Sequence, residues 1–466
     1  MLARGGFPDA ARTLFALVAG SALLATVLSS RDASLRAARS AVVLVLVALA
    51  ILAAASAAWT IGEPADSLRY GFVVAGYGAL ATSAAVIARD RRGRTAIYAT
   101  IAALAALSGV VGLVGAGAQE FPFGQRVGGS WEAAGTFEYG PANALLDVAA
   151  LPILLTAMAG RSRALALAAA GGAAIAGAVI ALSDSLFCQL AGLAVLALAV
   201  TFPGATIGRA RVVAAGAALL IAAAAFGAHL VAGRFAPPCD FGGDGARLAT
   251  LAAIVIAAPA AWALGRRSLA AERASPLRPI AALAAAAALA MGGTVADPEG
   301  PCSAPTKAVE PYAGVLHGRP VLWEAAYKAA LDRPVGGSGA DTYGLASAPY
   351  QEGEDVLYAH NLPLELWAEL GLAGAAAAIA LYAAVGAALT HARRRSAFWL
   401  AGPAVAAFML ANLVDFPWHL AGAGAVWALA LGVLIAAGRS SAHGPAERLA
   451  DEEPSPTGPR YHGVPN

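Results

Sequence analysis

The sequence predicts an all-α fold, a polytopic bundle of membrane-spanning helices with one long loop on its outer face. Of the 466 residues, 59% are hydrophobic and only 13% are charged, and the mean hydropathy is +0.67. A soluble protein of this length could not bury so much apolar surface. Apolar runs such as residues 41–59 are long enough to cross a bilayer. The net charge of +2 comes without a basic tract, so no nucleic-acid partner is expected.

About thirteen apolar segments have the length of a membrane span. Their centres lie near residues 20, 50, 79, 106, 150, 173, 194, 221, 255, 286, 379, 405 and 428. We interpret the first segment as a span and not as a signal peptide, because its apolar run is long and no clear cleavage site follows it. If either the first segment or the one near residue 286 does not span, the number is twelve.

The charged residues alternate in sign from loop to loop. One set of loops is rich in arginine: Arg31, Arg36 and Arg39; Arg89, Arg91, Arg92 and Arg94; Arg161 and Arg163; Arg209 and Arg211; Arg266, Arg267, Arg273 and Arg278; Arg393, Arg394 and Arg395. The loops between them are acidic, with Glu63, Asp66, Glu120, Glu132, Glu138, Asp184, Asp240 and Asp244, and a run over residues 297–355. By the positive-inside rule the arginine loops face the cytoplasm, so the N-terminus lies outside and the C-terminus inside.

This pattern divides the chain into three parts. Residues 1–117 form N-terminal transmembrane helices, and residues 118–437 form the rest of the membrane region. The polar, Pro-rich residues 438–466 are expected to be a disordered cytoplasmic tail.

Two outward-facing loops are long, residues 118–141 and residues 295–362, and long loops that are not linkers usually carry function. The second contains "RPVLWEAAYKAALDRPVGGSG", in which Pro320 suits the first position of a helix and Pro334 ends it. The apolar residues that share one helical face are Leu322, Trp323, Ala326, Tyr327 and Ala330. We therefore expect an amphipathic helix of about a dozen residues on the outer membrane surface, with Arg319 immediately before it.

The stretch "YAHNLPLELWAELGLAG" repeats this arrangement where the loop meets the next span. Pro363 suits the first helical position, and His360 and Asn361 precede it. An apolar face follows, made of Leu364, Trp367 and Leu370. Glu365 and Glu369 are four residues apart and share a face, so they are expected to point into the bundle or to the water boundary.

Arg319 and His360 thus each stand at the N-terminus of a helix, which carries partial positive charge and free N–H donors. Cations at both ends predict an anion between them, and phosphate fits because arginine binds it bidentately. The same helix end favours the neutral form of His360, which can act as a base. The alternatives are an interfacial anchor for His360, a headgroup contact for Arg319 and a packing pair for the two glutamates.

In order, these residues resemble the signature of the bacterial O-antigen ligase and polymerase family. That signature is an arginine, a nearby tryptophan, P-x-x-G-x-G, and then H-N-x-x-L-x-x-x-x-E-x-G-x-x-G. The matching residues are Arg319, Trp323, Pro334, Gly337, Gly339, His360, Asn361, Leu364, Glu369, Gly371 and Gly374. Residues 135–155 and 413–432 resemble a mid-chain span and the closing spans of the family, the latter opening with an aspartate. The resemblance covers residues 118–437.

The resemblance implies a GT-C-like bundle and an inverting glycosyltransferase on the outer face of the plasma (inner) membrane. The donor would be an undecaprenyl-diphosphate-linked glycan and the acceptor a lipid or a glycan, with no essential metal and no cofactor. His360 would activate the acceptor hydroxyl or steady the diphosphate, and Arg319 would bind the diphosphate. Asn361, Trp323 and Glu369 are the further residues implied at the substrates.

Several points stay open. The family often has an arginine in a hairpin where this chain has "LSDSLF" at residues 182–187, so the second diphosphate-binding arginine is sought among Arg234, Arg126 and Arg247. The acceptor separates a ligase from a polysaccharide polymerase or a protein O-glycosyltransferase, and the sequence does not name it. A polysaccharide or lipid-linked glycan exporter is the alternative from another class, although its ionisable groups would lie near mid-membrane, where this chain has almost none.

The chain has three cysteines. Cys188 falls inside an apolar span, where a lone cysteine is usually a small buried hydrophobe. Cys239 and Cys302 lie in polar segments on the outer face, where disulfides persist. We predict a disulfide between them, the alternative being two unrelated exposed thiols.

Overall fold

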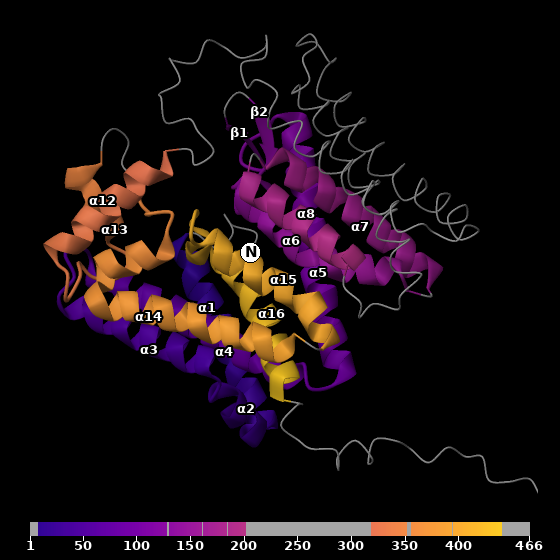
Figure 1. The fold of residues 1–466 in the computed structure, drawn as a ribbon, viewed down its shortest axis with the longest axis horizontal. Helices are drawn as coiled ribbons and strands as arrows, with labels where there is room; N and C mark the ends of the chain where they lie inside the picture. Colours follow the sequence, from indigo (N-terminus) through magenta and orange to yellow (C-terminus); the bar gives the residue numbers. More distant parts are fainter. Residues whose placement is uncertain are drawn as a thin grey trace, which may run out of the picture.

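The computed structural model describes residues 8–127, 130–160, 162–183, 185–201, 318–351, 356–393 and 395–439. These residues form a bundle of helices with a single two-stranded sheet in the described part of the chain (Figure 1). The predicted all-α, polytopic fold is confirmed. Ten of the thirteen predicted span centres fall within the described helices, and the centres near residues 221, 255 and 286 lie outside the described residues.

Eight described helices are long and apolar enough to cross a membrane. They are α1 (Asp9–Ser29), α3 (Ala41–Ala55, continued by the 3-10 turn η2, Ser56–Ala58), α4 (Pro64–Ile87), α5 (Arg91–Ala118), α6 (Gly140–Met158), α7 (Arg163–Leu182), α14 (Leu362–Ala392) and α16 (Ala421–Arg439). Two shorter apolar helices are α8 (Leu186–Thr201) and α15 (Ser396–Ala411). The first predicted span is thus a long apolar helix, as expected.

The remaining elements are short and lie between the spans. They are α2 (Arg31–Ala38), the strands β1 (Gly124–Val127) and β2 (Ser130–Ala133), η3 (Gly135–Phe137), α12 (Arg319–Asp332), α13 (Tyr343–Ser347), η4 (Ala348–Tyr350) and η5 (Pro417–His419). Side-chain caps begin three of the long helices: Asp90 accepts from Gly93 N at 2.7 Å, Ser162 from Leu165 N at 3.3 Å and Asn361 from Leu364 N at 3.1 Å. Helices α4, α6 and α14 have a proline in the first turn, where a missing N–H costs nothing.

Two helices form the centres of the packing. Helix α4 packs against α1, α3 and α16, while α6 packs against α5, α7, α8 and α15. Helix α16 also contacts α6 and α15, and so joins the two groups into one core. The ring of Tyr77 on α4 illustrates this junction, because it is fully buried and its hydroxyl donates to the carbonyl of Trp418 at 2.8 Å.

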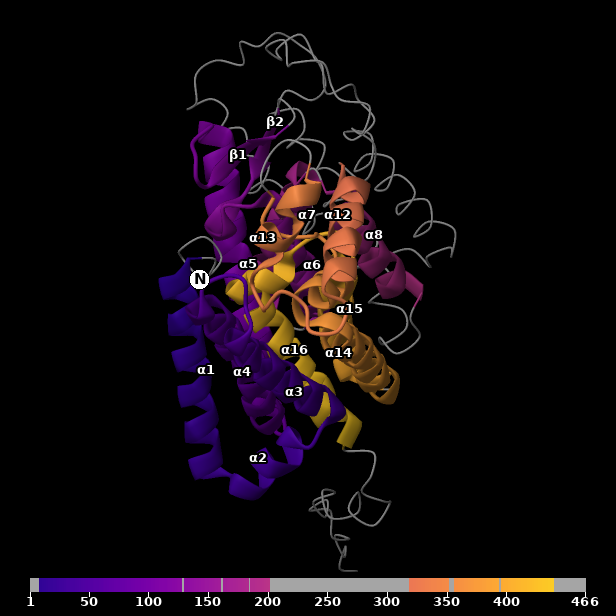
Figure 2. The same ribbon diagram turned by 90° about the vertical axis from the view of Figure 1, so that its left-hand side faces the viewer.

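The connections at the two ends of the bundle differ in charge. Helix α2, with its arginines, lies at the opposite end from the β1–β2 hairpin and α12–α13 in both views (Figures 1 and 2). At the α2 end, Arg36 and Arg89 lie close enough to act electrostatically on Arg439, the last residue of α16. The polar segments that contain the β1–β2 hairpin and α12–α13 lie at the other end of the bundle (Figures 1 and 2). This arrangement agrees with the alternation of charge in the sequence.

Two local details differ from the sequence-based expectation. The hairpin of residues 124–133 was not expected in an all-α chain; its strands pair antiparallel with Arg126 opposite Trp131. Helix α12 forms where predicted, but Arg319 is its first residue and Gly318 its N-cap. Its buried residues are Ala325, Ala326, Ala329 and Ala330, while Tyr327 is exposed. Small alanines face α14 because the two helices pack closely, which turns the larger apolar side chains outward.

Candidate active site

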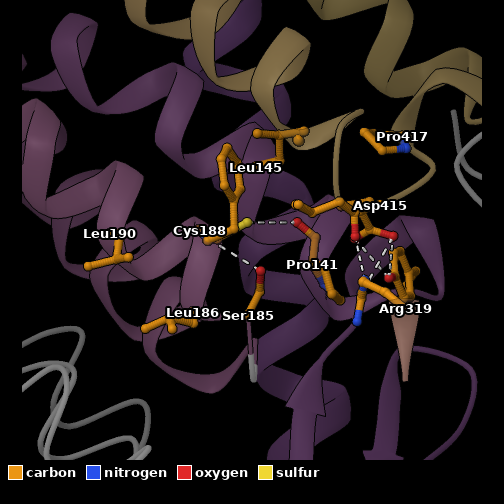
Figure 3. Close-up of a pocket in the computed structure, with 14 residues that line it drawn as sticks. Pro141, Leu145, Ser185, Leu186, Cys188, Leu190, Arg319, Asp415 and Pro417 are labelled. Carbon is orange, nitrogen blue, oxygen red and sulfur yellow. Dashed lines mark hydrogen bonds and ion pairs between the residues drawn. The ribbon is translucent and has the colours of Figure 1, made fainter. Parts of the chain in front are cut away.

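Arg319 links α12 to the segment between α15 and η5. Its Nε donates a hydrogen bond to the carbonyl of Val414, and its Nη2 lies 3.9 Å from Oδ1 of Asp415. The side chain is 18% exposed, so the guanidinium stands at the border of the protein and not in open solvent. Figure 3 shows it reaching toward Asp415 from α12.

Asp415 is the carboxylate around which the site is arranged. The hydroxyl of Tyr139 donates to its Oδ1 at 2.8 Å and to its Oδ2 at 2.9 Å, and Phe416 N donates to Oδ1 at 2.9 Å. Burial, and then the neighbouring Asp415 charge, raise the pKa of Tyr139 well above its ordinary value, so Tyr139 stays protonated and donates. Since Tyr139 precedes α6, Asp415 connects α6, α12 and the end of α15.

His360 reaches the same carboxylate from the segment before α14. Its Nε2 lies 3.9 Å from Asp415 Oδ1, and its ring meets Phe416 edge-on at 4.9 Å between centroids. Its Nδ1 lies 3.1 Å from the carbonyl oxygen of Tyr358. A carbonyl only accepts, so Nδ1 carries the hydrogen and the lone pair of the neutral ring is on Nε2.

The environment of His360 favours that neutral ring. Burial lowers the pKa of His360; Asp415 raises it and Arg319 lowers it. The net direction is below the ordinary value, so the ring is neutral and its Nε2 can accept a proton. The sequence-based expectation of a neutral histidine is the same, but the main cause here is burial and not a helix end.

The side chains of the other predicted residues near His360 form hydrogen bonds with backbone groups. Asn361 caps α14, with Oδ1 accepting from Leu364 N at 3.1 Å and Nδ2 donating to Leu413 O at 3.1 Å. Trp323 Nε1 donates to the carbonyl of His360 at 3.4 Å. Asn361 therefore fastens the histidine segment to the end of α15, and Trp323 fastens it to α12. Contacts from these two side chains to a substrate stay predictions.

Glu365 and Glu369 both point into the bundle, as predicted. Glu369 is 1% exposed, and its Oε1 accepts from Thr342 N at 2.8 Å and Tyr343 N at 2.9 Å. Glu369 therefore holds the start of α13, and it is not among the residues that line the cavity described below.

The glycines of the P-x-x-G-x-G and E-x-G motifs lie where the 334–339 loop packs against α14. Helix α14 is interrupted at Gly371, whose φ of 62° and ψ of −153° suit only glycine. Leu372 N there donates to Pro334 O at 2.9 Å, and Gly339 N donates to Glu369 O at 2.8 Å. A Cβ on Gly371 would lie 2.0 Å from the carbonyl oxygen of Val335. Gly371 thus admits the 334–339 loop into the helix.

A cavity of about 230 Å³ lies beside Arg319 and Asp415 (Figure 3). Its polar lining comes from Tyr139, Ser185, Arg319 and Asp415. Its apolar lining comes from α6, α8 and the end of α15, and includes Ala142, Leu145, Leu186, Phe187, Leu190 and Ala411. Cys188 also lines it, and its Sγ donates to the carbonyl of Pro141 at 3.4 Å. His360 borders this space through Asp415 without lining it.

Arg126 lies exposed on β1 and is not part of the cavity lining. Arg234 and Arg247, the other candidates for a second diphosphate-binding arginine, lie outside the described residues, as do Cys239 and Cys302. The predicted disulfide therefore stays a prediction. Cys188 is buried, as expected.

Sequence reasoning did not select Asp415, Tyr139 or His419 as site residues. Asp415 could have been selected, because it is the aspartate that opens the closing spans in the resemblance. Tyr139 lies 276 positions from Asp415, and nothing in "GTFEYGPAN" indicates its partner.

A comparison with known protein families matches part of the chain. Residues 241–379 match the family model described as O-antigen ligase. The match includes Arg319, the 334–339 loop and His360, the residues on which the resemblance was based. No curated protein matches the chain. The family is one of glycosyl-transferring enzymes of the ligase or polymerase kind that act on lipid-linked glycans. The chain is thus a multi-pass membrane protein in which residues 241–379 match the O-antigen ligase family model.

Proposed function

We propose that this protein transfers a glycan from undecaprenyl diphosphate to an acceptor hydroxyl on the outer face of the plasma membrane. The observation that carries the proposal is the convergence of Arg319 and His360 on Asp415, each with a nitrogen 3.9 Å from the same oxygen. One cation able to bind a diphosphate and one neutral base stand beside a single cavity. The O-antigen ligase match supports the same class of reaction.

The cavity fits the chemistry of such a donor. Its polar end holds Arg319, a fixed charge that can bind a phosphate oxygen bidentately. Its apolar part, between α6 and α8, offers hydrocarbon surface to a lipid chain. An amphiphile with an anionic head and a long isoprenoid tail would meet both.

The residues then divide the reaction between them. The acceptor oxygen attacks the anomeric carbon of the donor sugar, and the bond from that carbon to the diphosphate oxygen breaks. His360 Nε2 takes the acceptor proton, which a neutral ring with its hydrogen on Nδ1 can do. Arg319 stabilises the charge that develops on the leaving diphosphate. Attack opposite to the leaving group inverts the configuration at the anomeric carbon.

The outer-face assignment rests on charge. Helix α2, which begins with Arg31 and contains Arg36, lies at one end of the bundle, while α12, which begins with Arg319, lies with the β1–β2 hairpin at the other end (Figures 1 and 2). Since arginine-rich loops remain in the cytoplasm, the site would face outward. Lipid-linked glycans that have been flipped across the membrane would be available there.

The test is transfer in membranes from a lipid-linked glycan to its acceptor, with Arg319→Ala and His360→Ala. Each is expected to abolish transfer while expression stays normal. Lys328→Ala is the matched control, because Lys328 is an exposed residue of α12 whose described partners, Glu324 and the ring of Tyr350, are not part of the site. Retained transfer in either site variant removes that residue from the reaction. Retained transfer in both ends the proposal.

A further inference from the structure

The segment that carries His360 is held in an unusual backbone conformation. His360 has a φ of 53°, in the left-handed region that side chains other than glycine rarely adopt. A non-glycine residue in that region is strained and persists only where its surroundings fix it. Neighbouring contacts must therefore hold this segment in place.

Glu365 supplies one of these contacts from the first turn of α14. Its Oε2 accepts the N–H of Ala359 at 2.8 Å, immediately before His360 in the chain. Ala359 is fully buried, so this N–H has no access to water. Without the carboxyl group it would be a buried donor with no acceptor.

His419 acts on the same segment from η5. Its Nε2 shares a short hydrogen bond with Oε1 of Glu365, and both side chains are at most 3% exposed. Its ring stacks on Tyr358, with 3.9 Å between centroids and 27° between planes. The pair therefore fixes both residues that precede His360, one through its N–H and one through its ring.

Resting on the function proposed above, we propose that Glu365 and His419 form a positioning dyad for His360. The dyad holds the Tyr358–His360 backbone so that the Tyr358 carbonyl receives the Nδ1 hydrogen and Nε2 faces Asp415. It thereby sets both the tautomer and the place of the base. Tyr358 is the common element, because its ring carries the stack and its carbonyl binds the histidine.

The dyad acts through His360 and not on substrate. Neither Glu365 nor His419 lines the cavity. Burial lowers the pKa of His419, which favours its neutral ring, and its contacts are with Glu365 and Tyr358 and not with the cavity. The groups that face His360 itself are Asp415, Arg319 and the Phe416 ring, with His419 behind Tyr358.

Two variants test the dyad. Glu365→Met keeps the length of the side chain and removes both hydrogen bonds. His419→Phe keeps an aromatic ring on Tyr358 and removes only the bond to Glu365, so it serves if Glu365→Met does not fold. Glu324→Met is the control, since Glu324 is an exposed glutamate of α12. Folding is checked by the melting temperature and elution profile in detergent.

The first readout needs no donor or acceptor. Diethyl pyrocarbonate modifies neutral imidazole, and mass spectrometry follows its attachment at His360 as a function of pH. In the native protein the midpoint should lie below the ordinary value of about 6.5, since burial lowers the pKa of His360. In the variants the segment loosens and water reaches the ring, so the midpoint should rise toward about 6.5 and modification at high pH should become faster.

The second readout is transfer. We expect kcat to fall about 10- to 100-fold with little change in KM, because a base displaced by about 1 Å loses alignment without weakening donor binding. Folded variants whose His360 midpoint and modification rate match those of the native protein would overturn the proposal. The labelling result stands apart from the proposed function. If His360→Ala retains transfer, the function falls, while the labelling still reports whether the dyad positions the ring.

Discussion

Tyr139 donates one hydroxyl to both carboxylate oxygens of Asp415, at 2.8 and 2.9 Å. The bond joins the segment before α6 to the end of α15, two parts of the chain 276 positions apart. It orients the carboxylate so that Oδ1 faces both Arg319 and His360. The placement of Arg319 and His360 around one carboxylate oxygen thus involves a tyrosine that contributes no charge.

Tyr139→Phe tests this dependence. Loss of a hydrogen bond to a charged group corresponds to about 1.5–3 kcal/mol, so kcat/KM for transfer should fall roughly 10- to 100-fold. Tyr382→Phe is the matched control, because it also deletes a donating tyrosine hydroxyl, whose acceptor is the backbone carbonyl of Met409 on α15 at 2.8 Å. Equal activity in the two variants would show that the orientation of Asp415 is unimportant.

Asp415→Asn should change the pH dependence of transfer. A base must be neutral, so the rate is present above the pKa of His360 and is lost as the pH falls through it. Asp415 raises that pKa against the lowering by burial. Without its charge the pKa falls further, so the acidic limb of the kcat/KM profile should move to lower pH. The plateau should also drop, by about 10-fold or more, because a weaker base accepts the proton less readily. An acidic limb that stays in place or moves to higher pH would contradict this role of Asp415.

The spans could be predicted because a bilayer constrains both length and composition. Residues 41–59 can hardly be anything but a membrane helix, and α3 with its 3-10 turn covers Ala41–Ala58. The hairpin at residues 124–133 has strands of only four residues, which are too short for a pattern of apolar and polar residues to reveal them.

The site could be predicted only in part. Arg319 and His360 stood out because each precedes a proline that begins a helix. Asp415 and His419 did not stand out, because an acidic residue or a histidine near a membrane surface is usually there for contact with water and does not by itself indicate a site. Their importance depends on tertiary contacts with Tyr139 and Glu365, which no local pattern encodes.

Gly371→Ala should prevent α14 from accepting the 334–339 loop. Alanine does not adopt a φ of 62° with a ψ of −153° readily, and its Cβ would lie 2.0 Å from Val335 O. Backbone strain of about 1–3 kcal/mol and a similar cost of overpacking should add, so the variant should melt well below the native protein or fail to accumulate.

The control for this variant is on the same helix. Gly386→Ala places its Cβ where no atom lies within 4 Å. Alanine favours a helix over glycine by about 1 kcal/mol, so this variant should melt at or above the native temperature. If the two alanine variants were equally stable, the glycine at the break would not be required.

Arg12 on α1 contacts Tyr358, which lies two residues before His360. Arg12 is 6% exposed. Its Nη1 donates to Asp341 Oδ2 and its Nη2 to the hydroxyl of Tyr358, each at 3.0 Å. Arg12→Leu leaves the Asp341 carboxylate, which is only 14% exposed, without this partner, and removing one member of a buried pair costs up to about 3–5 kcal/mol. It also removes one of the contacts that hold Tyr358, whose carbonyl binds His360, so the melting temperature and the rate of transfer should fall together.

A second substitution separates the charge from the packing. Asp341→Asn combined with Arg12→Leu leaves no uncompensated charge, and asparagine tolerates the left-handed backbone of Asp341, whose φ is 62°. The double variant should therefore recover part of the lost melting temperature. It should not recover the rate of transfer, because the hydroxyl of Tyr358 still lacks Arg12. Arg69→Gln, which breaks only the exposed pairs with Asp9 and Asp66, should change the melting temperature little, as surface pairs contribute about 0–1 kcal/mol. A double variant no more stable than Arg12→Leu would mean that the loss comes from packing and not from the buried charge.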